Sequence, residues 1–379
     1  MLSYGSHQLD EDDILAVADV LRHGWLTQGD KVPEFERALA AYVDCRHAVC
    51  VSSGTAALHL ACLALGINHS SRVWIPAITF VASANCARYC GAEVDFVDVH
   101  AATGNMCLDA LEKKLILAEA ENSLPELVIV VDLTGRPMDM DELQRLKQRY
   151  GFKIIDDASH ALGAEYPDGK KVGSHVVADI TTVSFHPVKP ITTAEGGAAL
   201  TDQTDLAELI AQLRTHGILR SSDQPPWYYD QQCLGFNYRM SDLQAALGIS
   251  QLNKIDKFIQ IRQKIADRYN ALAGLEGIEL PPAAENGKSG WHLYTIRITD
   301  EATISRDEMM EKLHNVGIGV QLHYLPVYSH SYYRQQVGMQ YRLDNSESYA
   351  ASAISLPIHC NLTAEQQQMV ISQVKTFLG

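Results

Sequence analysis

A lysine bracketed by two prolines follows an apolar, strand-like segment at residues 180–185. Pro187 precedes Lys189 and Pro190 follows it directly. Because proline fixes φ and has no backbone N–H, these residues are predicted to form a rigid loop rather than a helix. Such a loop would present the Lys189 amine as a nucleophile or base. A single lysine is more often a surface charge, so this interpretation requires partner residues.

Two adjacent carboxylates, Asp156 and Asp157, follow the apolar run at residues 153–155. In open α/β sheets, ligands bind at the carboxyl ends of the strands. One of these acids is therefore a candidate to lie beneath a bound cofactor. Helix capping or a surface acidic pair would explain the same two residues.

A turn of small residues, Ser53, Gly54 and Thr55, lies between a strand-like run at 48–51 and a helical pattern. The free N–H groups and the dipole of a helix start favour a phosphate, and glycine lets the backbone approach closely. Ordinary N-capping by Ser53 or Thr55 would also account for this turn.

These three features together supply the groups that pyridoxal 5′-phosphate (PLP) chemistry requires. A lysine amine binds the cofactor aldehyde, and a carboxylate keeps the pyridine ring protonated as an electron sink. A phosphate site at Gly54 and Thr55, an acid at Asp157 and the amine of Lys189 together predict a PLP-dependent protein.

The periodicity of the chain predicts an α/β fold in which helices flank a mostly parallel central sheet. After residue 241 the pattern changes, which predicts a large domain at 1–255 and a small α+β domain at 256–379. Strands are expected at 48–51, 72–75, 93–97, 127–131, 153–155, 180–185, 197–200, 291–298 and 319–323, and helices at 55–65, 80–90, 108–117, 140–150, 242–272, 306–315 and 363–377.

The composition excludes several classes of partner. The 379 residues carry a formal net charge of −15, which argues against nucleic acid or anionic membranes as partners. No apolar run is long enough to span a membrane, and the acidic amino terminus does not resemble a secretory signal, so a cytoplasmic protein is expected. The eight cysteines lack metal-ligand spacing, so we expect no metal and interpret them as reduced structural thiols.

Four segments, SSGTAAL, IIDDASHALGAEY, SFHPVKPITTAEGGA and NYRMSDLQAALG, resemble the DegT-type sugar aminotransferases. The resemblance covers nearly the whole chain, with the segments in the same order. It implies a fold type I PLP-dependent transferase that forms a homodimer with a shared active site. It also implies that a nucleotide sugar and L-glutamate are the substrates.

The same resemblance assigns roles to individual residues. Lys189 matches the lysine that binds PLP covalently and acts in catalysis, and Asp157 matches the partner of the pyridine nitrogen. Asn237 matches a residue that reaches the phosphate from the adjacent subunit. The other cofactor contacts that it implies are Gly54, Thr55 and Ser184 at the phosphate, Phe80 over the ring and His160 beside it.

Substrate contacts are less clearly indicated by the sequence. Thr27, Arg220, His323 and Tyr324 are candidates, although structural or solvent-exposed roles would also suit them. Segments 26–29, 76–85 and 320–328 resemble the family members of pseudaminic acid biosynthesis. They imply amination at C4 of a UDP-linked 4-keto-6-deoxy sugar of the N-acetyl-L-altrosamine type. The alternatives are a dTDP- or GDP-linked sugar, another PLP enzyme such as an amino-acid aminotransferase or a cysteine desulfurase, and a non-enzymatic PLP-binding regulator.

Overall fold

The computed structural model describes residues 1–174, 177–220, 223–225, 227–283 and 287–379. Its centre is a seven-stranded sheet in the order β1-β7-β6-β5-β4-β2-β3. Pairing is parallel from β3 to β6, whereas β7 is antiparallel to both of its neighbours. The strands are β1 (His47–Val51), β2 (Arg72–Pro76), β3 (Glu93–Val97), β4 (Leu127–Val131), β5 (Lys153–Asp157), β6 (Ile180–Ser184) and β7 (Gly197–Thr201).

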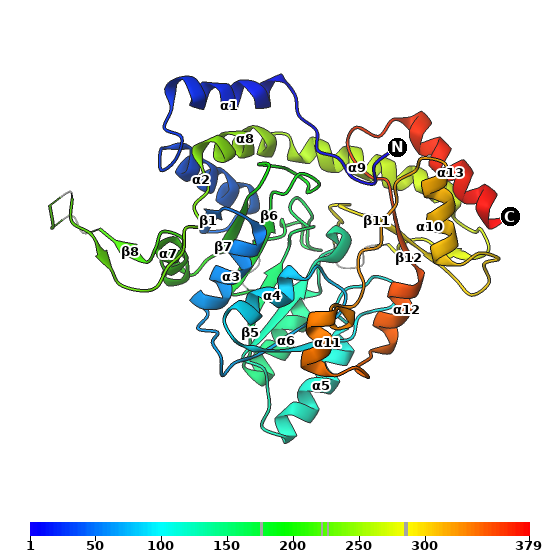
Figure 1. Cartoon of the computed structure of the whole chain (residues 1–379), viewed down its shortest axis with the longest axis horizontal. Helices are drawn as coiled ribbons and strands as arrows, with labels where there is room; N and C mark the ends of the chain where they lie inside the picture. The colour runs from blue at the N-terminus through cyan, green and yellow to red at the C-terminus, as the bar shows by residue number, and fades with distance from the viewer. Residues whose placement is uncertain (175–176, 221–222, 226, 284–286) are drawn as a thin grey trace.

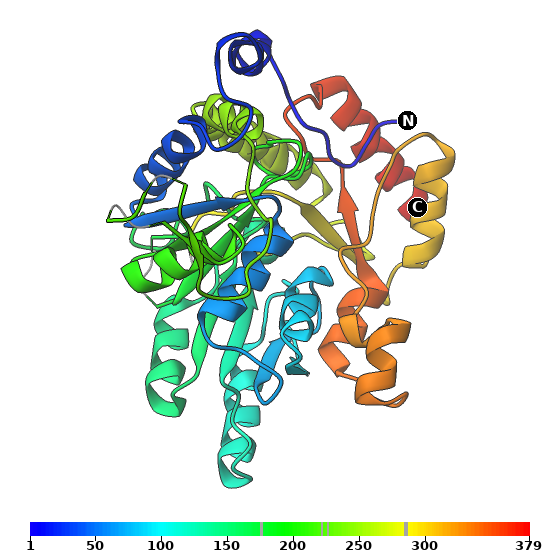
Figure 2. The same cartoon turned by 60° about the vertical axis from the view of Figure 1, so that its left-hand side comes forward.

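Helices cover both faces of this sheet, as Figures 1 and 2 show. Alternate residues of β4 enter opposite cores, Val128 and Val130 on one side and Leu127 and Ile129 on the other. Burial on both faces explains the continuous apolar run of this strand. The first core packs against α2 (Lys31–Val43), α5 (Leu108–Ala120), α6 (Met140–Tyr150) and α8 (Asp242–Leu252), and the second against α3 (Gly54–Ala64), α4 (Ala82–Tyr89) and α7 (Thr204–Leu213).

The C-terminal part is built on a second, three-stranded sheet in the order β10-β11-β12. The first residues of the chain pack beside this part, where Leu2 exchanges backbone hydrogen bonds with Gly317 and Gly319 at 2.7 Å each. Its elements are α9 (Ile255–Tyr269), η2 (Asn270–Leu272), β10 (Ile278–Glu279), β11 (Tyr294–Ile298), α10 (Arg306–Asn315), η3 (Val327–Ser329), α11 (Ser331–Val337), α12 (Asp344–Ser352), β12 (Ala353–Leu356) and α13 (Ala364–Leu378).

Four elements complete the description: α1 (Glu11–His23), the short η1 (Leu133–Gly135), and the paired strands β8 (Ile218–Leu219) and β9 (Asp230–Gln231). Figure 1 shows the segment with β8 standing away from the rest of the fold. The described residues of this protruding arm are 218–220, 223–225 and 227–234. Within the described ranges, no helix combines the length and the apolar character that crossing a membrane requires.

The α/β prediction is confirmed, but two predicted elements are wrong. The single helix expected at 242–272 is divided into two helices, and α8 ends at Leu252. Just after this end, Lys254 forms ion pairs with Asp10 and Asp13. The strand expected at 319–323 has only an isolated bridge between Gln321 and Ser355, since nearby backbone groups bond to the N-terminal segment. The division at residue 255 stays a prediction.

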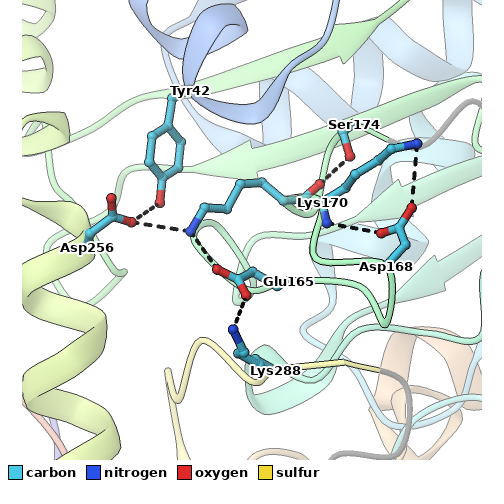
Figure 3. Close-up of polar contacts among 8 residues, drawn as sticks. Tyr42, Glu165, Asp168, Lys170, Ser174, Asp256 and Lys288 are labelled. Carbon is cyan, nitrogen blue, oxygen red and sulfur yellow. Dashed lines mark hydrogen bonds and ion pairs between the residues drawn. The ribbon is translucent and has the colours of Figure 1, made fainter.

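A network of ion pairs joins the loop after β5 to α9 and to Lys288 of the C-terminal part (Figure 3). Glu165, in the loop after β5, binds Lys288 at 2.5 Å and Lys171 at 3.1 Å. Lys171 also binds Asp256 in the first turn of α9 at 3.3 Å, and Tyr42 of α2 donates to the same carboxylate at 2.8 Å. These contacts fix the start of α9 against α2 and the loop after β5.

Candidate active site

A cavity of 780 Å³ lies at the carboxyl ends of β4, β5 and β6. This is the edge at which open α/β sheets bind ligands. Segments from the start of α3, from the ends of the strands and from residues 321–325 meet around it. Nine residues predicted from the sequence line this cavity: Gly54, Thr55, Phe80, Asp157, His160, Ser184, Lys189, His323 and Tyr324.

One end of the cavity is formed by the N-terminus of α3. Ser53 is the N-cap of this helix and accepts a hydrogen bond from the backbone N–H of Ala56 at 3.1 Å. A Cβ atom at Gly54 would lie 2.8 Å from the Cβ of Ser184, so only glycine allows this approach. The helix start and the Ser184 hydroxyl therefore share one corner, where the dipole and the N–H groups favour a phosphate.

Asp157 ends β5 and is buried beside the cavity. Its two carboxylate oxygens accept hydrogen bonds from the hydroxyls of Ser83 at 2.7 Å and Ser159 at 2.6 Å. The Ser83 hydroxyl also lies 2.8 Å from that of Thr79. These contacts hold the carboxylate in one orientation. Sequence reasoning missed both serines, and Ser159 could have been found from its place two residues after Asp157.

Lys189 lies in a turn after β6, where its backbone N–H donates to the carbonyl of His186 at 2.9 Å. The predicted non-helical loop is therefore confirmed. Burial of the ammonium group lowers the pKa of Lys189 to about 8, and the opposing attraction of Asp157 is weaker. A substantial fraction of the amine is consequently neutral near physiological pH, as proton transfer requires.

The histidines of the cavity are kept neutral by burial. Nδ1 of His160 accepts a hydrogen bond from the backbone N–H of Thr134 at 3.3 Å, which leaves the proton on Nε2, 3.4 Å from the Tyr324 hydroxyl. Burial and the nearby Lys189 hold the pKa of His160 well below its usual value and lower that of His323 to about 3. The Tyr324 hydroxyl can therefore accept from His160 and donate into the cavity.

Three candidates from the sequence lie outside this cavity. Thr27, Arg220 and Asn237 are exposed, and a β-bridge links Asn237 to Thr215 near the protruding arm. Asp156 is fully buried on the opposite face of β5, where desolvation raises its pKa to about 8. Of the two adjacent acids, only Asp157 lines the cavity.

The residues of the cavity fit PLP. The start of α3 and Ser184 suit its phosphate, Asp157 suits its pyridine nitrogen and Lys189 suits its aldehyde. Among the residues that sequence reasoning missed, His292 is also close, with its ring centroid 4.3 Å from that of His160. The sequence offers no signal for His292, because it comes from the distant C-terminal part.

Comparisons with known proteins agree with this geometry. The sequence profile of the DegT/DnrJ/EryC1/StrS aminotransferase family matches residues 7–375. A UDP-4-amino-4,6-dideoxy-N-acetyl-β-L-altrosamine transaminase from Campylobacter jejuni is 39% identical over 371 residues, which are 98% of this chain and 96% of that protein.

Solved structures extend the similarity to the whole fold. Helicobacter pylori PseC, described as an aminotransferase involved in the biosynthesis of pseudoaminic acid, has a TM-score of 0.92 and 32% identity, covering 100% of this chain and 99% of that one. The sugar aminotransferase Spr1654 from Streptococcus pneumoniae, in its PMP form, has a TM-score of 0.90 and 29% identity at the same coverage of both chains.

Proposed function

Because the chain belongs to the DegT/DnrJ/EryC1/StrS aminotransferase family, we propose that it aminates the C4 keto group of a UDP-linked 4-keto-6-deoxy sugar in pseudaminic acid biosynthesis. The proposed acceptor is UDP-2-acetamido-2,6-dideoxy-β-L-arabino-hex-4-ulose, and the proposed amino donor is L-glutamate. The observation that carries this proposal is the Lys189 amine facing the same cavity as the Asp157 carboxylate, in a chain similar to transaminases of that sugar.

PLP is the proposed cofactor, and it supplies an aldehyde and an electron-withdrawing ring to the reaction. Lys189 would bind it covalently, Asp157 would contact the ring nitrogen, and Gly54, Thr55 and Ser184 would contact the phosphate. Phe80 and His160 line the same cavity and would enclose the ring. The hydrogen bonds from Ser83 and Ser159 support the role given to Asp157, because they fix where the negative charge lies.

Proton transfer is the proposed catalytic task of Lys189. Its pKa of about 8 allows the amine to accept a proton and to return it at neutral pH. Tyr324 and His323 are the proposed sugar contacts. Tyr324 lies 5.9 Å from the Phe80 ring between centroids, so its hydroxyl is well placed beside a sugar that rests against the cofactor.

A homodimer would complete the site. Asn237 is exposed and lies outside the cavity of its own chain, which supports its proposed role in the partner's site. The surface supports association, because large apolar side chains are exposed on α1, after it and on the protruding arm. These residues are Leu21, Trp25, Trp227 and Leu234.

The identity of the sugar is the part of the proposal that has a direct alternative. That alternative is a dTDP- or GDP-linked 4-keto-6-deoxyhexose. Purified protein loaded with PLP should be supplied with L-glutamate and each 4-keto sugar nucleotide in turn. We expect amination of the UDP-linked N-acetyl sugar to have the highest kcat/KM, measured by mass spectrometry and by NMR of the new amine carbon. Lys189→Ala is the matched control and should yield no amino sugar.

Three results would contradict the proposal in different ways. Preferential amination of a dTDP- or GDP-linked sugar would keep the chemistry but change the substrate. Repeated transfer of the glutamate amino group to an added 2-oxo acid, without amination of any sugar nucleotide, would point to an amino-acid aminotransferase. A protein that binds PLP but shows neither reaction would support the regulatory alternative.

A further inference from the structure

A group of three cysteines and one histidine lies between α3 and α4, behind the cavity. His59 and Cys62 are three residues apart on α3, whereas Cys86 and Cys90 are four residues apart on α4 and its C-cap. These spacings place each pair on one face of its helix. Because α3 and α4 pack against each other, the two faces meet.

The three thiols differ in their access to solvent. Cys62 and Cys86 are fully buried, with their sulfur atoms 3.6 Å apart, whereas Cys90 is only partly buried. The Cys86 thiol also donates to the carbonyl of Ser83 at 3.2 Å. Cys90 is therefore the thiol of this group that a small solute can reach first.

The pKa of the Cys90 thiol is also lowered, whereas that of Cys62 is raised. Hydrogen bonds with Cys62 and with His59 lower the pKa of Cys90 to about 6, although burial acts against them. The His59 ring is held in place, since its Nδ1 lies 3.3 Å from the Tyr238 hydroxyl and its centroid 4.9 Å from that of Phe236. These contacts favour the thiolate form of Cys90, whereas hydrogen bonds with neighbouring thiols and burial raise the pKa of Cys62.

The remaining surroundings favour redox chemistry over metal binding. Across the part of the chain that the structure describes, no three His, Cys, Asp or Glu side chains are arranged to hold a metal ion. Two cysteines outside the group lack the same activation, because burial raises the pKa of Cys45 to about 12 and also raises that of Cys360. A low-pKa, partly exposed thiol beside a second thiol is the arrangement of redox-sensitive cysteines.

We propose that Cys90 and Cys62 form a peroxide-sensitive modification site, in which Cys90 is oxidised first and Cys62 then closes a disulfide with it. The Cys90 sulfur attacks hydrogen peroxide, the O–O bond breaks and hydroxide leaves, which gives a sulfenic acid. The Cys62 sulfur then attacks the Cys90 sulfur, the S–O bond breaks and the oxygen leaves as water with the Cys62 proton. The two electrons lost by the sulfurs have passed to the peroxide, and a thiol reductant restores both thiols.

The test is differential alkylation of the folded protein with and without limiting hydrogen peroxide, followed by peptide mapping without reduction. We expect a peptide linked through Cys62 and Cys90 to form first. In Cys62→Ser, a dimedone probe should label Cys90, because the sulfenic acid has no thiol to resolve it. Cys360→Ser is the matched control, since it removes a partly buried thiol outside the group and should leave the linked peptide unchanged.

A second measurement uses the unmodified chain, so it does not depend on the folding of a variant. Alkylation of Cys90 should have its midpoint near pH 6, and at pH 7 it should proceed about fivefold faster than alkylation of Cys360. The proposal is overturned if Cys90 and Cys360 share one pH profile, if peroxide oxidises Cys360 as fast as Cys90, or if Cys62 and Cys86 become linked first.

Discussion

The proposed chemistry depends on Lys189, and the protonation of its amine can be measured without any cofactor. Only a neutral amine reacts with acetic anhydride, and ordinary lysines titrate at about 10.4. We expect acetylation of Lys189 in the cofactor-free protein to be half-maximal near pH 8, in line with the pKa lowered by burial. Peptide mass mapping measures this, with the exposed Lys170 as the internal reference.

The sign of the effect can be checked with Asp157→Asn. The carboxylate raises the pKa of Lys189, so its removal should move the acetylation midpoint to lower pH. If Lys189 and Lys170 gain label over the same pH range, burial does not control this amine and the proposed base is wrong.

Ser83 is expected to be a positioning residue that acts through Asp157. Ser83→Ala removes the hydrogen bond of 2.7 Å to the carboxylate, while Ser159 keeps the other one. A hydrogen bond to a charged group is worth about 1.5–3 kcal/mol, so we expect kcat to fall about 10- to 100-fold. Because Ser83 does not line the cavity, KM for L-glutamate should change little.

The exposed Ser70 provides the control for this substitution, since Ser70→Ala should change neither constant. A role limited to packing would instead lower the melting temperature of Ser83→Ala and leave kcat within about twofold of the parent, which would exclude a positioning role.

At the scale of elements, the network around Glu165 is expected to stabilise the contact between the large sheet and α9. Glu165→Gln removes the carboxylate that Lys288 and Lys171 share. Partly exposed pairs contribute up to about 1 kcal/mol each, so a loss of about 1 kcal/mol in the free energy of unfolding is expected from urea denaturation. Glu121→Gln, at an exposed position, should cost less than about 0.5 kcal/mol.

The pH dependence of this contribution has a definite sign. Hydrogen bonds with Lys288 and Lys171 lower the pKa of Glu165. The stabilisation is therefore present above the ordinary pKa of glutamate and is lost as the pH falls through the lowered value. The difference between the parent and Glu165→Gln should consequently vanish in acid. A difference that does not shrink as the pH falls below the ordinary pKa of glutamate would argue against the ion pairs as its source.

Elements with a strong local signal were predictable from the sequence. The bounds of β3, β4 and α6 agree with the prediction, because fully buried strands and amphipathic helices leave a clear pattern. The break between α8 and α9 was not predictable. Helical residues continue across Asn253, and Lys254 finds its partners, Asp10 and Asp13, about 240 positions away in the chain.

The whole molecule determines which candidate residues meet. Lys189, Asp157 and Gly54 could be predicted because strand ends gather at one edge of a parallel sheet. His292 and Ser83 could not be predicted. His292 comes from the C-terminal part, and Ser83 is one of several small residues in α4. Nor could the sequence show that Thr27, Arg220 and Asn237 lie outside the cavity of their own chain. These residues would contact a ligand in the cavity only if they belonged to a neighbouring subunit.

The proposed sharing of the site between two subunits makes a prediction that only an assembly can meet. Lys189→Ala lacks the amine but keeps Asn237, whereas Asn237→Ala lacks the amide but keeps Lys189. Each variant alone should be inactive or nearly so, yet a hybrid dimer would contain one complete site, formed by Lys189 of one subunit and Asn237 of the other. With random pairing in an equal mixture, half of the dimers are hybrids with one working site of two, so activity should recover to about a quarter of the parent.

Differently tagged subunits measure hybrid formation independently. Hybrids that form without any recovery would show that Asn237 does not act across the interface.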